Sequence, residues 1–126
     1  MVGSDYTDIQ DLMSSYFDGL YHSDSKVLKG VFHADLRYVN GTSGTYEQMG
    51  LDAYMARIDA RTPPASRGEP REEVIERIAL KGDRIGIVEA RMTMIGRNYQ
   101  DLLTLMNTDD GWRVLIKVFS FVERKD

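Results

Sequence analysis

The sequence predicts an α+β domain in which helices come first and an antiparallel sheet follows. Up to about residue 60 the apolar residues recur at steps of three and four, which is the period of one helical face. After Pro70 four extended runs are separated by short turn signals, which is typical of an antiparallel meander. The 126 residues form one domain, residues 1–126, and the 42% of hydrophobic residues supply its core.

Three helices are expected in the first half of the chain. The longest runs from Ser4 to Tyr21, because its apolar residues keep the helical spacing and acidic residues crowd its first turns. A third helix is predicted from Leu51 to about Ala60 on the same spacing. Between them, Asp24 is a second N-cap candidate, and it opens a short helix expected to bury Val27, Leu28, Val31 and Phe32.

The remaining segments are predicted to be strands and turns. An early strand, Leu36 to Val39, precedes the turn signal Asn40-Gly41, and Gly44 to Met49 is its short return partner. All three prolines lie in a loop from Thr62 to Pro70, which separates the helices from the meander. The four later strands are Val74 to Leu80, Ile85 to Ile95, Tyr99 to Met106 and Trp112 to Val122.

Composition excludes several classes of function. The absence of cysteine excludes disulfides, thiolate metal sites and cysteine nucleophiles, and a net charge of −4 argues against nucleic-acid binding. No apolar window approaches the length of a membrane span, and the first ten residues are too polar for a signal peptide, so a cytoplasmic location is expected. The two histidines lack the spacing of metal ligands, and there is no glycine-rich phosphate motif. Neither a metal nor a cofactor is therefore expected.

The strand register follows from the two predicted turns of the meander. With Gly96 to Asn98 as the first loop, Thr93 faces Asp101, and the second turn then puts Asp101 opposite Lys117. This register places one set of residues on one face: Ile87, Glu89, Arg91, Thr93, Tyr99, Asp101, Leu103, Leu105, Leu115, Lys117, Phe119 and Phe121. The opposite face holds Val88, Ala90, Met92, Met94, Leu102, Thr104, Met106, Trp112, Val114, Ile116 and Val118.

Both predicted faces of the sheet are substantially apolar, so both must be covered. The helices can cover one face, and a second copy of the chain is the simplest cover for the other. We therefore expect a homodimer packed through sheet faces. The alternative is a single, strongly curved sheet that closes on itself.

Five segments carry a resemblance to a known family: Tyr16 to Leu20, Phe32 to Asp35, Tyr99 to Leu105, Asp110 to Val114, and Lys117 to Phe119. Together with the order of elements, they resemble the lumazine-binding branch of the nuclear transport factor 2-like superfamily, over nearly the whole chain. The resemblance implies a cone-shaped α+β barrel of the cystatin-like type, with a curved antiparallel sheet wrapped by three N-terminal helices. It also implies a dimer and an apolar pocket between the helices and the concave sheet.

The same superfamily contains ketosteroid isomerases and SnoaL-like polyketide cyclases, so the resemblance also implies an enzymatic alternative. Those isomerases use a tyrosine on the first helix as an oxyanion donor, and Tyr16 matches it by position. Their proton-abstracting aspartate stands on the strand after the helices, but Leu36 to Asn40 holds no carboxylate. Asp35 precedes that strand and is expected to end the short helix.

Asp101 and Lys117, with Thr93 beside them, are the most informative candidates for a site. A carboxylate and an ammonium in the middle of a sheet must pair with each other or remain hydrated, because burying an isolated charge is very costly. They either line a pocket and offer donors and acceptors to a polar ring edge, or form a structural ion pair or dimer contact. Glu89 and Arg91 extend the same polar stripe and share this ambiguity.

Other side chains have weaker functional signals. Four tyrosines suit a flat aromatic ligand because each joins an apolar ring to a hydroxyl, but they are equally suited to a core: Tyr16, Tyr38, Tyr54 and Tyr99. His33 is the only histidine in a suggestive context and is a candidate acid–base group, although a solvent-facing position accounts for it as well.

Three functional hypotheses result, and the sequence leaves open which sheet face lines the pocket. The first is a dimeric, cofactor-free protein that binds a small apolar or heteroaromatic molecule in a pocket walled by Tyr16, Leu20, Phe32, Tyr54, Thr93, Asp101 and Lys117. The second is an isomerase, dehydratase or cyclase acting by acid–base chemistry on a small cyclic or polyketide-like substrate, with catalytic candidates Tyr16, His33 and Asp101. The third is an interaction module whose pocket is filled by side chains.

Overall fold

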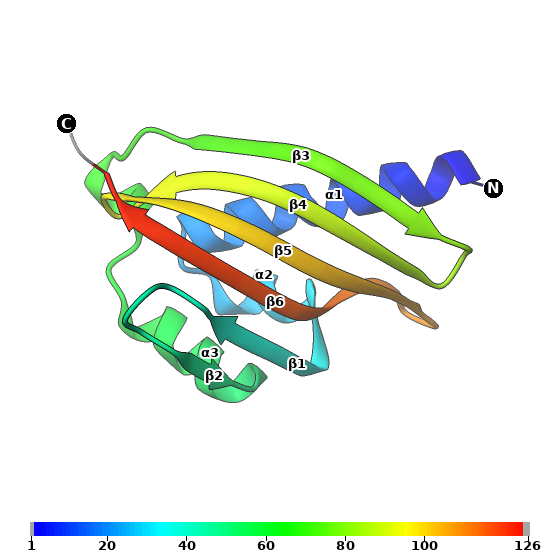
Figure 1. Cartoon of the computed structure of the whole chain (residues 1–126), viewed down its shortest axis with the longest axis horizontal. Coiled ribbons are helices and arrows are strands. Elements are labelled where there is room, and N and C mark those ends of the chain that lie inside the picture. The colour runs from blue at the N-terminus through cyan, green and yellow to red at the C-terminus, as the bar shows by residue number, and fades with distance from the viewer. Residues whose placement is uncertain (1, 125–126) are drawn as a thin grey trace.

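A computed structural model describes residues 2–124 and shows a six-stranded curved sheet with its helices on one side (Figure 1). The helices are α1 (Val2–Tyr21), α2 (Ser25–Lys29), α3 (Leu51–Ala60) and the short 3-10 helix η1 (Pro64–Arg67). The strands are β1 (Phe32–Asn40), β2 (Glu47–Met49), β3 (Glu72–Lys81), β4 (Ile85–Met94), β5 (Arg97–Thr108) and β6 (Gly111–Glu123). The α+β class is confirmed.

The sheet order is β2-β1-β6-β5-β4-β3, so β2 and β3 are its edges and the sheet does not close on itself. The meander β3 to β6 is antiparallel as predicted, whereas β1 runs parallel to β6. This one parallel pairing arises because the chain crosses over through α3 and η1 before the meander begins.

Helix α2 is shorter than expected. The Asp24 side chain caps it, accepting hydrogen bonds from the backbone of Lys26 and Val27, but the helix ends at Lys29. Because the Val31 carbonyl then accepts a hydrogen bond from the backbone N–H of Val114 in β6, the chain enters the sheet at Phe32. The predicted helical ending at Phe32 to Asp35 is therefore wrong: these residues begin β1. Val27 was expected to be buried and is instead 38% exposed.

The turn between β4 and β5 differs from the predicted loop and moves Thr93 to the other face. The turn residues are Ile95 and Gly96, both in the left-handed region with φ of 48° and 72°. Such a two-residue turn is rare for a β-branched residue, so the sequence favoured Gly96 to Asn98 instead. Thr93 consequently pairs with Asn98, and the prediction that it lies beside Asp101 is wrong.

The register error affects every residue of β4. Asp101 pairs with Ala90, so the side of β4 that faces the helices carries Val88, Ala90, Met92 and Met94. The alternate residues of β4, Ile87, Glu89, Arg91 and Thr93, lie on the outer face of the sheet. Glu89 and Arg91 are therefore not part of a stripe with Asp101, and they form ion pairs with residues of β3.

A β-bulge between β5 and β6 adjusts the second predicted register. Trp112 pairs with Asn107 rather than Met106, and beyond the bulge Asp101 pairs with Phe119. Asp101 and Lys117 are diagonal neighbours instead of direct partners, but they share the face toward the helices, as predicted. The extra residue of the bulge also turns Trp112 to this face, opposite to the expected one.

The core lies between the helices and the concave face of the sheet. Its fully buried members from α1 are Ile9, Met13, Tyr16 and Leu20, and they pack against Leu36, Leu103, Leu105 and Val114 of the strands. Three polar residues are buried with them: Asn40, Asp101 and Lys117. The outer face keeps exposed apolar side chains, among them Leu102, Val118 and Val122. None of the described helices is long and apolar enough to cross a membrane.

Candidate functional site

A cavity of about 370 Å³ opens between the end of α1, helix α3 and the concave face of the sheet. Its inner wall is made by buried side chains of the core, including Tyr54, Asp101 and Lys117. Its outer part is bordered by more exposed polar residues, including Glu47, Arg57 and Arg61. The complete lining is Leu20, Tyr38, Asn40, Thr45, Glu47, Tyr54, Arg57, Ile58, Arg61, Met92, Met94, Ile95, Arg97, Tyr99, Asp101, Lys117, Phe119 and Phe121.

A buried chain of hydrogen bonds forms the polar floor of this cavity. The Tyr16 hydroxyl donates to Asp101 Oδ2 at 2.5 Å, and it accepts from Lys117 Nζ at 2.7 Å. Lys117 Nζ also donates to the Tyr54 hydroxyl at 3.1 Å. No direct ion pair within 4.0 Å joins Asp101 to Lys117 in the part of the chain described; Tyr16 stands between the two charges. A simple cross-strand ion pair therefore does not describe the arrangement.

The environment of the floor keeps Lys117 charged and Tyr16 neutral. Burial raises the pKa of Tyr16 well above its usual value, and the negative charge of Asp101 raises it further. Burial alone lowers the pKa of Lys117, but interactions with Tyr54 and Asp101 outweigh burial and raise it. The ammonium also lies 5.1 Å from the ring centroid of Phe119, where cation–π attraction favours its charge.

Asp101 has one carboxylate oxygen without a partner. Its Oδ2 accepts the Tyr16 hydrogen bond, but its Oδ1 is buried and has no hydrogen-bond donor among the described residues. Leaving a buried acceptor unpaired costs about 1 to 3 kcal/mol, and more for a charged group. Asp101 itself borders the cavity. This orphaned oxygen is the clearest chemical feature of the site.

Aromatic rings form the walls around the polar floor. Tyr38 packs against Tyr54 with ring centroids 4.4 Å apart and against Phe119 at 5.1 Å. Tyr99 continues this wall, with its ring centroid 5.9 Å from Phe119 and 5.4 Å from Phe121. Flat apolar surfaces beside a few polar groups are characteristic of small-molecule pockets.

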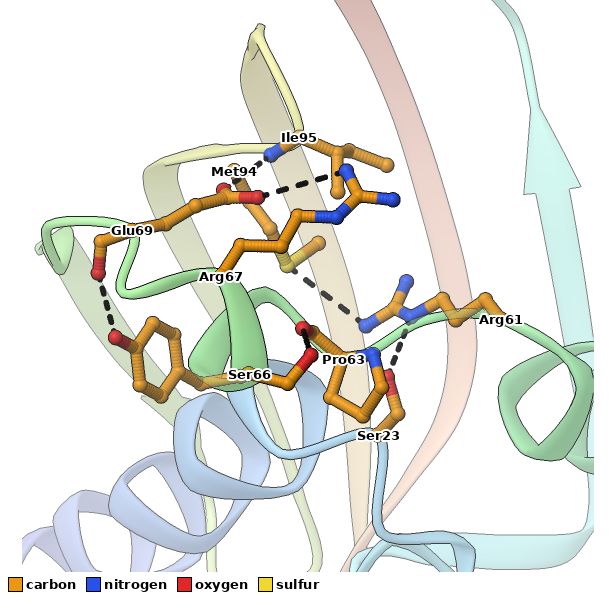
Figure 2. Close-up of polar contacts among 9 residues, drawn as sticks. Ser23, Arg61, Pro63, Ser66, Arg67, Glu69, Met94 and Ile95 are labelled. Carbon is orange, nitrogen blue, oxygen red and sulfur yellow. Dashed lines mark hydrogen bonds and ion pairs between the residues drawn. The ribbon is translucent and has the colours of Figure 1, made fainter.

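Arg61, the residue that follows α3, is held at the cavity by three neutral groups. Its Nε donates to Ser23 Oγ at 2.8 Å, and its Nη2 donates to the Leu20 carbonyl at 2.5 Å and contacts Met94 Sδ at 3.7 Å. Figure 2 shows the guanidinium between Ser23 and Met94, with its third nitrogen pointing away from both. These contacts tie the ends of α1, α3 and β4 together at one corner of the cavity.

The segment after Arg61 is anchored beside the same corner (Figure 2). The Tyr21 hydroxyl donates to the backbone carbonyl of Glu69, and the Glu69 carboxylate accepts from the backbone N–H of Ile95 at 2.8 Å. Ile95 lines the cavity and holds the left-handed conformation of the β4–β5 turn. The Glu69 contact thus supports a strained turn at the cavity rim.

The structure separates the seven residues that the sequence analysis grouped into a pocket. Leu20, Tyr54, Asp101 and Lys117 border the cavity. Tyr16 and Phe32 lie behind this lining, in edge contact with each other at 6.0 Å, and Tyr16 reaches the cavity only through its partners. Thr93 lies on the outer face and bonds to Asn98.

His33 also lies outside the cavity. The arginines that border the cavity, Arg57 and Arg61, were not predicted from the sequence. His33 lies on β1, where its Nδ1 accepts from the backbone N–H of Asp35. Arg57 and Arg61 continue the four-residue spacing of Tyr54 and Ile58 on α3, which is the signal that could have identified them. Among the described residues, no three His, Asp or Glu side chains gather so that they could hold a metal ion.

Comparison with known proteins places the chain in a family but gives it no activity. A nuclear transport factor 2-like protein of unknown function from Shewanella baltica has a TM-score of 0.84 at 18% identity, covering 97% of both chains. One from Silicibacter pomeroyi has a TM-score of 0.81 at 19% identity, covering 97% of this chain and 99% of that one. A cystatin-like fold protein from Burkholderia xenovorans has a TM-score of 0.70 at 16% identity, covering 97% and 95%. At these identities the likeness shows the fold alone.

No curated protein matches the chain in a sequence comparison. The profile of one family, described as "Putative lumazine-binding", matches residues 4–120, which is nearly the whole chain. That match, together with the shared fold, confirms the resemblance drawn from the sequence. The chain shares the nuclear transport factor 2-like fold with these structures, and it belongs to the family described as "Putative lumazine-binding".

Proposed function

We propose that the protein binds a small heteroaromatic or largely apolar molecule in the cavity between α3 and the sheet. The observation that carries this proposal is the unpartnered Oδ1 of Asp101, buried next to Lys117 and surrounded by aromatic walls. The cavity volume of about 370 Å³ lies in the range of small-molecule sites. The family description supports a heteroaromatic ligand.

The floor selects for a ligand edge that carries a donor beside an acceptor. Asp101 Oδ1 needs a hydrogen-bond donor. Lys117 has three N–H donors and gives one each to Tyr16 and Tyr54, so its third can serve an acceptor. An N–H next to a C=O, as on the lactam edge of a pteridine-dione, offers both groups in one plane. The aromatic walls then contact the faces of such a ring.

The experiment measures binding of lumazine and of its N-methylated derivatives by titration calorimetry. Asp101→Asn is nearly isosteric and retains an acceptor for Tyr16, but it offers the ligand an N–H in place of an oxygen. We expect it to weaken lumazine binding at least about tenfold, because a hydrogen bond to a charged group contributes about 1.5 to 3 kcal/mol. Glu89→Gln, on the outer face of the neighbouring strand, is the matched control. Equal affinity of Asp101→Asn and the native chain would assign Asp101 to structure.

The proposal includes a homodimer formed through the outer face of the sheet. Exposed apolar residues from three strands lie on this face: Val74 of β3, Leu102 of β5, and Val118 and Val122 of β6. Leu102 and Val118 are direct cross-strand partners, and exposed apolar surface of this kind is typical of contacts between subunits. The cavity opens on the opposite side of the sheet, so a partner there leaves the ligand site accessible.

Acid–base catalysis on a small cyclic or polyketide-like substrate is the second candidate, and Asp101 is the group that favours it. Its free oxygen lies in a buried, weakly solvated environment, as a proton-abstracting carboxylate requires. Tyr16 is less suited to the oxyanion role, because its hydrogen is already donated to Asp101. Exchange of ligand C–H protons in D₂O, followed by NMR, would distinguish catalysis from binding, and Asp101→Asn should abolish it.

A further inference from the structure

We infer that the ligand of this cavity carries a carboxylate, and that Arg61 binds it at the cavity rim. This inference rests on the proposed small-molecule function and adds to it the charge of the ligand. The inference does not depend on the family description, because it follows from the balance of charges around the cavity.

The cavity lining is positively charged, although the chain as a whole is negative. Four cationic side chains border the cavity, namely Lys117, Arg57, Arg61 and Arg97, against the two carboxylates Asp101 and Glu47. The lining therefore has an excess of two positive charges on a chain whose net charge is −4. A cleft with walls of one sign raises the local concentration of ligands of the opposite sign.

Three of these four cations already have a partner that compensates them. Arg57 makes a bidentate pair with Glu47 at 3.0 and 3.2 Å. Arg97 lies 3.5 Å from Glu123, and its guanidinium stacks over the Phe121 ring at 4.1 Å. Lys117 is linked to Asp101 through the Tyr16 hydroxyl.

Arg61 is the exception among the described residues that line the cavity. Its hydrogen-bond partners are Ser23 Oγ, the Leu20 carbonyl and Met94 Sδ, all of which are neutral. No described carboxylate lies within 4.0 Å of its guanidinium. Since Nε and Nη2 are used by the protein, Nη1 remains for a ligand (Figure 2).

The contacts of Arg61 also prepare it for binding. Arginine usually loses considerable side-chain freedom when it binds an anion, and this cost is reduced when the protein already fixes the guanidinium. Here two of its three nitrogens are held by α1 and the residues that follow it. One available nitrogen with two N–H groups suits a singly charged carboxylate. The geometry points to an amphipathic ligand, with a polar ring edge at Asp101 and a carboxylate at Arg61.

The test compares acids with their neutral amides of the same shape. Para-hydroxybenzoate, para-hydroxyphenylacetate and para-hydroxyphenylpropanoate each present a phenol donor to Asp101, and their three lengths sample the span to Arg61. Binding to the full chain is followed by NMR through the methyl groups of Met92 and Met94, which line the cavity. We expect at least one acid to bind about tenfold tighter than its amide, in line with the strength of charge-assisted hydrogen bonds.

Arg61→Gln should remove this preference for the acid. Arg67→Gln is the matched control, because Arg67 is a neighbouring arginine that does not line the cavity and lies 3.9 Å from Glu69 (Figure 2). If Arg61→Gln fails to fold, the ¹⁵N resonances of the Arg61 guanidinium in the native chain provide the same information. They should shift on addition of the acid and not of the amide.

The outcomes separate this inference from the proposed function. Equal binding of acids and amides at the methionine methyls would overturn the carboxylate inference and leave the binding function intact. An acid preference that persists in Arg61→Gln would also overturn it, because another cation would then hold the carboxylate. Absence of binding by acids, amides and lumazine alike would overturn both.

Discussion

Replacing Tyr16 with phenylalanine tests the buried network that forms the cavity floor. The change removes one hydroxyl that bonds to two charged partners, Asp101 at 2.5 Å and Lys117 at 2.7 Å. Each hydrogen bond to a charged group contributes about 1.5 to 3 kcal/mol, so the loss of both amounts to about 3 to 6 kcal/mol. Lys117 keeps Tyr54 as a partner, and the phenyl ring keeps the packing of the tyrosine. We therefore expect the free energy of unfolding to fall by about 3 kcal/mol.

Such a loss is a large part of the stability of an ordinary domain, which is about 5 to 15 kcal/mol. Urea unfolding followed by the fluorescence of Trp112, the only tryptophan, measures it directly. For a chain of 126 residues the midpoint temperature should fall by about 10 °C. Tyr6→Phe, at a 41% exposed position on the same helix, is the control and should change little. A loss below about 0.5 kcal/mol in Tyr16→Phe would refute the reasoning, since it would mean that the hydroxyl stabilises neither charge.

Three further outcomes are expected. Because the pKa of Tyr16 is raised in the folded state, the unfolded chain releases the hydroxyl proton first as the pH rises above 10.0. The free energy of unfolding should therefore decline in alkali, and it should decline less in Tyr16→Phe. Urea titrations at successive pH values measure both declines. Gly19→Ala should destabilise the chain by about 1 kcal/mol in thermal unfolding, because its Cβ would lie 2.6 Å from buried Leu28, and overpacking outweighs the gain in helix propensity. Leu102→Glu, on the outer face, should convert the proposed dimer to a monomer, as measured by light scattering, without changing the affinity for lumazine. A native chain that is already monomeric at high concentration would contradict the dimer.

Most of the fold could be predicted from periodicity and turn chemistry. The spacing of apolar residues located α1 and α3, and the alternation after Pro70 located the four strands of the meander. Errors arose where one residue overrides the local pattern. Ile95 adopts a positive φ that its side chain disfavours, and the contact between its backbone and Glu69 supports it from 26 residues away. No local rule predicts a turn that a distant carboxylate holds.

The candidate site was predictable only in part, for the same reason. Asp101 and Lys117 stood out because charges in mid-sheet require an explanation, and both border the cavity. Both charges are connected through Tyr16, which is 85 positions from Asp101 and 101 positions from Lys117 in the chain. No spacing rule in the sequence reveals contacts over such separations. Helical spacing could have placed Arg61 near the cavity, but it could not show that no described carboxylate pairs with its guanidinium in three dimensions.

The sequence by itself determined the class of fold, the family and the charged pair in mid-sheet, because these depend on patterns between near neighbours and on short motifs. The tertiary structure decided which side of the sheet Thr93 occupies and that a tyrosine separates the two buried charges. It also decided that Asp101 Oδ1 and the Arg61 guanidinium have no compensating partner among the described residues. Hydrogen bonding and charge compensation are properties of distances between atoms. Those distances exist only after α1, α3 and the sheet have packed around the same cavity.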